Sequence, residues 1–250
     1  MSLIDWTDLI AELGCWLCAG QTATFWWRDD DAVAPSSQLD RLLKFAEQVP
    51  LSLAVIPALA TPELVDRLAQ TSNVAVLQHG WRHQNHGGPS SKNEYPATRL
   101  DAEVSCELAA GKARLAMLFG DRALRVFVPP FHGFDDRFMP LLVARQIESI
   151  SRFGPCRAAV AGGGIREVNV HVSLFDWQSQ RFGGDAEALL RIVGHLRGRR
   201  LGQWRSEEPT GILTHHLVQD TPSYDFVERF LAATAGHSAV RWLDANSLFA

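Results

Sequence analysis

The sequence lacks the long apolar run that a membrane span requires, because no stretch of about 18 consecutive residues is without charged or polar side chains. The segment Met1–Gly20 also lacks the basic start and the uninterrupted apolar stretch of a secretory signal, since Asp5, Asp8 and Glu12 fall within it. We therefore expect no membrane partner and a cytoplasmic location for this chain.

The sequence also lacks a strong excess of either positive or negative charge. The 250 residues include 24 basic and 28 acidic side chains, for a net charge of −4, and no long run of either sign occurs. Proteins that bind nucleic acids carry a clustered positive footprint, so we expect no nucleic-acid partner. The small group of Arg197, Arg199 and Arg200 follows a helical pattern and is interpreted as a helix C-terminus, where the helix dipole favours cations.

Only four cysteines are present, and the motifs of several enzyme classes are missing. Cys15 and Cys18 form a C-x-x-C pair, but no second pair completes a zinc site, so we interpret them as two half-buried thiols. The dinucleotide-binding G-x-G-x-x-G motif, the P-loop and the G-x-S-x-G elbow are absent. The sequence therefore argues against a nucleotide-binding sheet and against a serine hydrolase.

Strand-like and helix-like segments alternate along the whole chain. Apolar runs such as Thr22–Trp27 and Leu51–Ile56 predict strands, and the helical spacing of apolar residues in Ser36–Val49 predicts a helix between them. The whole chain contains about seven or eight such strands, with helices between most of them and no linker-like break, which predicts a parallel sheet covered by helices. We expect one α/β domain over residues 1–250, a distorted (β/α) barrel of about seven strands, with residues 1–20 as an N-terminal helical extension within it.

Chemically capable side chains fall at five predicted strand ends, which is where barrel enzymes gather their catalytic groups. The Gly-, Ser-, Asn- and Pro-rich segment Asn85–Ala97 is interpreted as a lid or binding loop. The five groups are Arg28–Asp31, His79 with His83, Pro129–His132, Asp176–Trp177 after the predicted long strand Glu167–Phe175, and His215–His216.

Two of these groups predict a metal site. The adjacent carboxylates of Asp29, Asp30 and Asp31 repel one another unless a cation is present. His79 and His83 are four residues apart, which places both imidazoles on one face of a helical turn and lets them reach one ion. Two histidines and one carboxylate leave positions open for water and substrate. We therefore predict one divalent metal ion as cofactor, with Zn²⁺ favoured and Co²⁺, Ni²⁺ or Mn²⁺ as alternatives.

The pair His215–His216 offers a general acid, because histidine titrates near neutrality and can protonate a leaving amine. Neighbouring residues of a strand point to opposite faces, so only one of the two imidazoles can face the barrel axis. The other is interpreted as a capping or packing residue.

Taken in order, these groups resemble the motifs of the polysaccharide deacetylases of carbohydrate esterase family 4. That family has an acidic pair after its first strand, an H-x-x-x-H pair, a proline–aromatic turn, an Asp/Trp motif and a late Leu-x-His strand. The resemblance spans residues 24 to 216 and implies a distorted barrel that hydrolyses the N-acetyl group of an amino sugar. The matching residues are Asp30-Asp31, His79 and His83, Pro129-Pro130-Phe131, Asp176-Trp177 and Leu213-Thr214-His215.

The resemblance also implies a role for each matching residue. A register shift by one residue would make Asp29 the base and Asp30 the ligand, and the sequence leaves this open. The implied catalytic residues are Asp30 as general base, His215 as general acid and Asp176 beside His215; the implied metal ligands are Asp31, His79 and His83; and the implied substrate contacts are Pro130, Phe131 and Trp177, the last against the acetyl methyl. Outside these motifs, we expect Trp81 to contact the substrate as a ring that stacks on a sugar.

Two departures from the family pattern matter. The family's proline motif begins with an arginine that pairs with the base, but Val128 stands at that place. Arg28 lies two residues before Asp30, and alternate residues of a strand share a face, so we expect Arg28 to replace it. Family members generally act outside the cytoplasm. A small linear or cyclic amide therefore stays an alternative to a carbohydrate substrate, and a non-catalytic carbohydrate-binding protein stays an alternative function.

Overall fold

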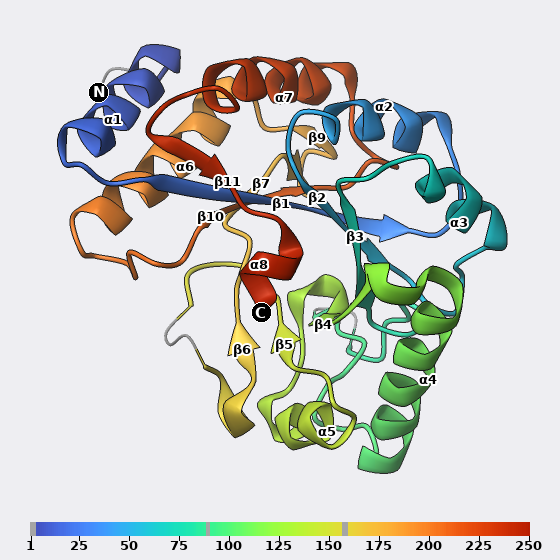
Figure 1. The fold of residues 1–250 in the computed structure, drawn as a ribbon. Coiled ribbons are helices and arrows are strands. Elements are labelled where there is room, and N and C mark those ends of the chain that lie inside the picture. Colours follow the sequence, from blue (N-terminus) through green and yellow to red (C-terminus); the bar gives the residue numbers. More distant parts are fainter. Residues whose placement is uncertain (1–3, 89–90, 157–159) are drawn as a thin grey trace.

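The protein is built on one parallel sheet. A computed structural model describes residues 4–88, 91–156 and 160–250. The strands of the main sheet are β1 (Ala23–Ala32), β2 (Leu51–Val55), β3 (Val74–His79), β4 (Ala123–Val128), β5 (Ser149–Ile150), β6 (Arg166–Glu167), β7 (Val172–Ser173), β10 (Thr210–Thr214) and β11 (Val240–Trp242). Eight of them follow the order β6-β5-β4-β3-β2-β1-β10-β7, and β11 pairs with β1 (Figure 1). A separate antiparallel pair joins β8 (Phe175–Asp176) to β9 (Arg181–Phe182).

The irregular segment of residues 166–174 contains both β6 and β7, the first and the last strand of this order, and so closes the sheet on itself. Its first part, β6, pairs with β5, and its last part, β7, pairs with β10. Between them the Val168 N–H donates to the Ile150 carbonyl of β5 and the Val170 N–H donates to the Arg152 carbonyl just beyond this strand, each at 3.2 Å. The ring therefore consists of β1 to β5, this segment and β10, which makes seven strands. The predicted distorted (β/α) barrel is confirmed. The predicted long strand Glu167–Phe175 is not continuous but is divided among the short strands β6, β7 and β8.

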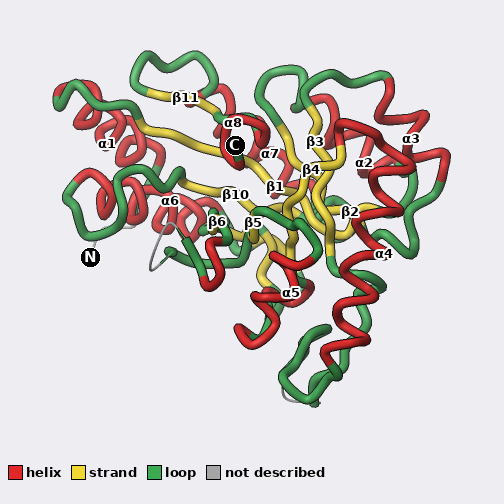
Figure 2. Tube along the Cα trace, turned by 60° about the horizontal axis from the view of Figure 1, so that its bottom comes forward, coloured by secondary structure: helices red, strands yellow, loops and turns green. Residues whose placement is uncertain are grey.

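Apart from α8, the helices lie around the outside of this ring (Figures 1 and 2). Local residues favour the starts of two of them: the Ser36 hydroxyl accepts from the Leu39 N–H at 3.0 Å, and Pro62 occupies the first turn of the following helix. Within the described ranges, no helix is both long and apolar enough to cross a membrane. The helices are α1 (Trp6–Cys18), α2 (Ser37–Phe45), α3 (Pro62–Ala69), α4 (Asp101–Phe119), α5 (Met139–Ala144), α6 (Asp185–Arg200), α7 (Thr221–Thr234) and α8 (Ala245–Phe249), with 3-10 turns at Gly120–Arg122, Pro130–His132, Asp136–Phe138 and Gly162–Gly164.

Alternation along β1 separates the outer core from the barrel interior. Trp27 packs in the cluster beneath the surrounding helices, whereas Trp26 belongs to the interior cluster. The helix α8 lies at the centre of the ring of strands (Figure 1), and the ring of its Phe249 meets the Trp26 ring edge-on at 5.6 Å. Side chains two apart on a strand share a face, so Arg28 and Asp30 continue the interior row toward the C-terminal ends of the strands.

Two predicted segments lie partly outside the described residues. The predicted loop Asn85–Ala97 contains residues 89–90, and the predicted N-terminal extension of residues 1–20 begins with residues 1–3. The described part of the extension forms α1, which buries Leu9, Leu13 and Trp16 against the rest of the chain.

Candidate functional site

The three aspartates at the end of β1 point to different partners. The pairing of β1 with β2 shifts its register between Asp29 and Ala32, and Asp31 has a left-handed backbone with φ of 74°. An irregularity of this kind re-aims side chains that strict alternation would send to opposite faces. As a result Asp30 and Asp31 both line one cavity, while Asp29 turns toward β10.

Asp29 connects β1 to the segment that follows β10. Its carboxylate accepts from the Thr214 hydroxyl at 2.6 Å, from the His216 N–H at 2.9 Å and from the His216 imidazole at 2.5 Å. The Thr214 hydroxyl oxygen in turn accepts from the Trp27 indole N–H at 2.9 Å. Asp29 and the His216 side chain are fully buried, so His216 is the packing member of the histidine pair and its neighbour His215 faces the cavity.

Arg28 and Asp30 form a buried bidentate ion pair. The guanidinium Nε lies 2.7 Å from one carboxylate oxygen of Asp30, and Nη2 lies 3.0 Å from the other. The remaining nitrogen donates to the Ser151 carbonyl at 3.0 Å and hydroxyl at 2.7 Å. Burial acts to raise the pKa of Asp30, but the charges of Arg28 and nearby histidines outweigh it and leave that pKa lowered. Asp30 is therefore a carboxylate that faces the cavity in its ionised form.

Asp31, His79 and His83 converge on one point. Nε2 of His79 lies 3.1 Å from an Asp31 carboxylate oxygen, and Nε2 of His83 lies 3.2 Å from the same oxygen. The Nδ1 of His79 is 3.0 Å from the Val128 carbonyl, which can only accept, so this nitrogen carries the proton. With Nδ1 protonated, the Nε2 atom of His79 meets the carboxylate oxygen either through a proton of its own, as an imidazolium, or through a shared metal cation.

The charges around Asp31, His79 and His83, and the hydrogen bond that orients the His79 ring, fit a divalent cation. Burial lowers the pKa of His79, yet the neighbouring carboxylates outweigh it and raise that pKa, while burial and the charge of His79 lower the pKa of His83. The site thus attracts positive charge but holds His83 neutral, as a ligand must be. The carbonyl behind the His79 ring orients it as outer contacts orient metal-bound imidazoles.

His83 reaches this point from a loop. The spacing of four residues predicts a helical turn, and that prediction is wrong, because residues 80–83 lie outside any helix and both Gly80 and His83 have positive φ, 56° and 57°. The buried carboxylate of Glu94 holds the loop by accepting the N–H groups of Trp81 at 3.2 Å and Arg82 at 2.8 Å. Burial raises the pKa of Glu94. No sequence pattern marked Glu94 as a residue that shapes the site.

A cavity of about 710 Å³ opens over these groups, within the size range of small-molecule sites. The Trp177 ring stands perpendicular to the His215 ring, with centroids 5.1 Å apart, and the His83 ring contacts Phe131 at 4.4 Å. Phe131 itself has φ of 56°. The cavity is lined by Asp30, Asp31, His79, His83, Lys92, Phe131, His132, Trp177, Gln180 and His215.

Three residues predicted for the site lie elsewhere. The Asp176 carboxylate is exposed and accepts from Ser179 Oγ at 2.6 Å and from the Gln178 N–H at 2.9 Å, and no hydrogen bond or ion pair in the described part of the chain joins it to His215. Among the described lining residues of the cavity, neither Trp81 nor Pro130 is present. Pro130 is buried.

His132 lines the cavity, although no separate role could be assigned to it from the residue pattern. Its backbone has φ of 60°, which follows the positive φ of Phe131 and turns the imidazole inward. Burial, with the charge of Arg28, lowers the pKa of His132 to about 4. The imidazole is therefore neutral near pH 7, and an inward turn of this kind cannot be seen in the residue letters of a proline–aromatic motif.

A second group of three side chains, His171, His195 and Glu208, also brings its possible ligand atoms close together. Here the Gly211 N–H donates to Nδ1 of His171 at 3.0 Å, so the proton of this neutral ring sits on Nε2 and points to Glu208 at 3.1 Å. Glu208 also accepts from the Cys156 N–H at 3.1 Å. Nδ1 of His171 accepts from Gly211 and Nε2 carries the proton, so neither nitrogen of the neutral ring is free to bind a metal, and we interpret this group as a buried hydrogen-bond network.

Comparison with known proteins gives no match by sequence and clear matches by fold. No family model matches the chain, and no curated protein matches it. A protein from Mycobacterium smegmatis assigned as a polysaccharide deacetylase has a TM-score of 0.62 at 17% identity, over 99% of this chain and 92% of its own. A family 4 acetyl xylan esterase from Clostridium thermocellum, in complex with a cobalt ion, has a TM-score of 0.53 at 16% identity, over 90% of both chains.

A third solved structure is a mutant of a family 4 pseudoenzyme with restored enzymatic activity, with a TM-score of 0.57 at 12% identity, over 92% of this chain and 68% of its own. At such identities the likeness concerns the fold. The chain therefore has the fold of the polysaccharide deacetylases of carbohydrate esterase family 4, in agreement with the resemblance of its motifs.

Proposed function

We propose that this protein is a metal-dependent hydrolase that removes an N-acetyl group from an amino sugar of a carbohydrate. The observation that carries the proposal is the convergence of Asp31, His79 and His83 beside an ionised Asp30, with His215 on the same cavity. Four of the five lie at or directly after the C-terminal end of a barrel strand, and His83 lies on the loop that follows β3; this is where enzymes of this architecture place their catalytic groups. The matching fold of acetyl-removing enzymes supports the choice of an acetyl group.

Asp31, His79 and His83 are the proposed ligands of one divalent ion. Two imidazoles and one carboxylate suit Zn²⁺, Co²⁺, Ni²⁺ or Mn²⁺, and they leave coordination positions open. Such an ion, when bound, supplies Lewis-acid polarisation of an acyl carbonyl and makes a water molecule more acidic. The other groups of the cavity then have to move protons and hold the substrate.

Asp30 is the proposed general base. Its lowered pKa keeps it ionised at neutral pH, and the Arg28 pair fixes its carboxylate at the cavity wall. Asp29 fits this role less well, because Thr214 and His216 bind its carboxylate outside the cavity. We therefore assign Asp30 as base and Asp31 as ligand rather than the alternative register.

His215 is the proposed general acid that protonates the departing amine. It lines the cavity next to Trp177, and its Nδ1 is buried without a hydrogen-bond partner among the described residues. The bonds of Asp29 to His216 position the adjacent His215. Trp177 and Phe131 offer the apolar surface against which an acetyl methyl can pack. Asp176 has no part in this assignment, because its carboxylate is bound within its own turn.

Metal content and hydrolysis together test the proposal. After incubation with Zn²⁺ and removal of loose ions, elemental analysis should give one ion per wild-type chain and none in His83→Ala. Acetate release from N-acetylated sugars should require the ion and be lost in Asp30→Asn, which keeps the metal ligands. Absence of a bound ion in both proteins would refute the hydrolase assignment. An ion with sugar binding but without acetate release would indicate a non-catalytic carbohydrate-binding protein instead.

A further inference from the structure

His132 has a backbone conformation that a side chain disfavours. Its φ is 60°, in the left-handed region, and Phe131 before it has φ of 56°. Residues with a Cβ rarely adopt this region, whereas glycine adopts it readily. Strained backbone of this kind gathers at functional sites, so an observed case is a reason to ask what the side chain does.

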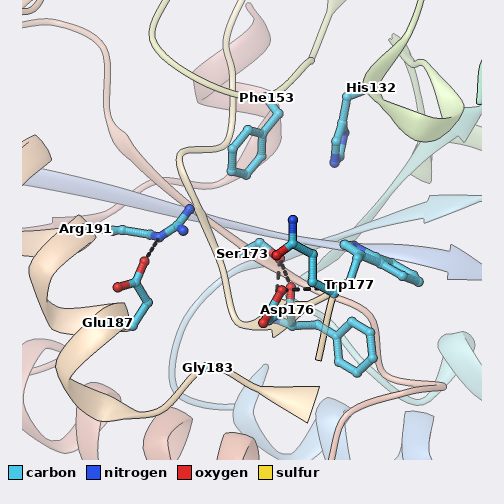
Figure 3. Close-up of a pocket in the computed structure, with 10 residues that line it drawn as sticks. His132, Phe153, Ser173, Asp176, Trp177, Gly183, Glu187 and Arg191 are labelled. Carbon is cyan, nitrogen blue, oxygen red and sulfur yellow. Dashed lines mark hydrogen bonds and ion pairs between the residues drawn. The ribbon is translucent and has the colours of Figure 1, made fainter. Parts of the chain in front are cut away.

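The imidazole of His132 points into the cavity over the proposed metal ligands. It lines that cavity together with Asp30 and His215, and it also borders an adjoining cavity of about 560 Å³. Figure 3 shows the ring extending from its loop toward Trp177, with the ring of Phe153 beside it. The His132 and Phe153 rings are stacked, with centroids 5.2 Å apart and planes at 29°. This stacking restricts the rotation of the imidazole, so its two nitrogens have defined directions.

Packing alone does not account for a histidine at this position. The Nδ1 atom of His132 is buried and has no hydrogen-bond partner among the described residues. A phenyl ring would stack on Phe153 as well, and it would not bury a polar nitrogen, which costs free energy when the nitrogen is unpaired. The nitrogens of the ring are therefore the feature that needs a function.

The burial of Nδ1 also indicates which nitrogen carries the proton. Burial, with the charge of Arg28, lowers the pKa of His132 to about 4, so the ring is neutral near pH 7 and only one of its nitrogens is a donor. Buried N–H groups without a partner are rarer in proteins than unsatisfied acceptors. The proton therefore belongs on Nε2, at the end of the ring that enters the cavity. An uncharged N–H at this place suits an oxygen acceptor.

We propose that His132 is a further substrate-contacting residue of this site, and that its Nε2–H donates a hydrogen bond to an oxygen atom of the substrate in the cavity that it shares with Asp30 and His215. The inference rests on the proposed function for the reaction that this substrate undergoes. The hydrogen bond explains why a histidine occupies a position that glycine would adopt without strain.

Substitutions that move the donor test the proposal on the metal-loaded protein. His132→Phe keeps a ring for the stacking contact but removes both nitrogens, and it should lower kcat/KM for N,N′-diacetylchitobiose by about 10-fold or more. His132→Gln carries an amide N–H as many bonds from the backbone as Nε2, whereas the amide of His132→Asn reaches only as far as Nδ1. We therefore expect His132→Gln to retain more activity than His132→Asn.

The comparison of His132→Gln with His132→Asn also covers the case in which His132→Phe fails to fold. The control is His237→Gln, because His237 is not among the described residues that line either cavity, and it should leave kcat/KM unchanged. Equal kcat/KM in wild type and folded His132→Phe would overturn the proposal, and so would equal kcat/KM in His132→Gln and His132→Asn.

The separate kinetic constants identify the oxygen that accepts the hydrogen bond. A loss confined to kcat would identify the acyl oxygen, because this atom gains charge only in the transition state. A rise in KM at unchanged kcat would identify a hydroxyl oxygen, which binds equally in the ground state and the transition state.

Binding separates this inference from the hydrolase assignment. If the metal-loaded wild type releases no acetate, the proposed hydrolysis fails, and an NMR titration with N,N′-diacetylchitobiose decides the role of His132 on its own. Weaker binding of this sugar to His132→Phe than to wild type and His237→Gln would support the hydrogen bond. Binding of equal strength to all three proteins, or to none, would overturn it.

Discussion

At the scale of single residues, the buried pair of Arg28 and Asp30 decides whether a base is available. The guanidinium charge is the largest influence that offsets the effect of burial on the pKa of Asp30. Removing it leaves a carboxylate that burial alone pushes toward the protonated form. The proposed base would then ionise only at higher pH.

We therefore expect Arg28→Ala to lower kcat/KM by about 100-fold at pH 7 and to move the acid limb of the pH–rate profile to higher pH. Arg28→Lys keeps a charge without the bidentate contact and should move that limb less. The measurement is kcat/KM from pH 5 to 9 on metal-loaded protein, with circular dichroism to confirm folding. An unshifted acid limb in folded Arg28→Ala would contradict the role of Arg28.

Some site residues could be predicted from the letters and others could not. The spacing of two between Arg28 and Asp30 on a strand was enough to predict their pairing, which the structure contains. The register shift that turns Asp31 into the same cavity as Asp30 has no visible signal in three consecutive aspartates. Glu94 and His132 act through loop conformation, and a loop sequence does not reveal which of its side chains will be buried.

At the scale of elements, the loop after β3 depends on Gly80. A Cβ on this residue would lie 1.9 Å from a Glu94 carboxylate oxygen and 2.5 Å from Pro130, at a φ of 56° that favours glycine. Gly80→Ala should therefore displace the loop that carries His83. We expect a loss of about 2 kcal/mol in the free energy of unfolding and a metal content well below one ion per chain.

Gly14→Ala is the matched control, because a Cβ there meets nothing within 4 Å and the residue lies inside helix α1. It should keep the metal and gain about 0.5 to 1 kcal/mol of stability. Urea unfolding and elemental analysis of both variants give the comparison. Full metal binding by Gly80→Ala would show that the loop can hold His83 in another conformation.

The contact between α1 and α6 depends on one buried carboxylate. Glu12 is 2% exposed and binds Arg200 at 2.7 and 3.0 Å and Arg197 at 3.3 Å. Arg200→Ala would leave this carboxylate buried with a single, largely exposed partner. We expect a loss of about 2 kcal/mol in urea unfolding. The exposed pair of Arg125 with Glu148 is the control, and Arg125→Ala should cost less than about 1 kcal/mol. Equal losses of unfolding free energy in Arg200→Ala and Arg125→Ala would mean that the burial of Glu12 does not strengthen its contact with Arg200.

At the scale of the whole molecule, the ring of strands explains both the success and the limits of prediction from sequence. Strong local patterns, such as the apolar runs of β2 and β3, give elements and their parallel order. The closure by residues 166–174 depends on hydrogen bonds to β5 on one side and β10 on the other. These partners are distant in sequence, so local periodicity cannot specify where that strand breaks.

The free energy of unfolding of the whole protein should depend on pH through its buried histidines. His195 is 6% exposed between α6 and the sheet, and burial, with the charges of His171 and Arg199, lowers its pKa to about 2. An unfolded chain restores a pKa of about 6.5 to this imidazole. Below that pH the imidazole binds a proton in the unfolded state but not in the folded state. The contribution of His195 to the free energy of unfolding is therefore fully present above pH 6.5 and is lost as the pH falls.

From pH 7.5 to 5.0, His195 alone should reduce the free energy of unfolding by about 2 kcal/mol. His195→Gln removes the titrating group. Over the same pH interval, the free energy of urea unfolding should therefore fall by about 2 kcal/mol less in this variant than in the wild type. His86→Gln, at an exposed position, should follow the wild type. The difference between variants isolates His195 from His79 and His216, whose raised pKa values act in the opposite direction. Parallel pH curves for wild type and His195→Gln would mean that His195 takes up a proton as readily in the folded state as in the unfolded chain.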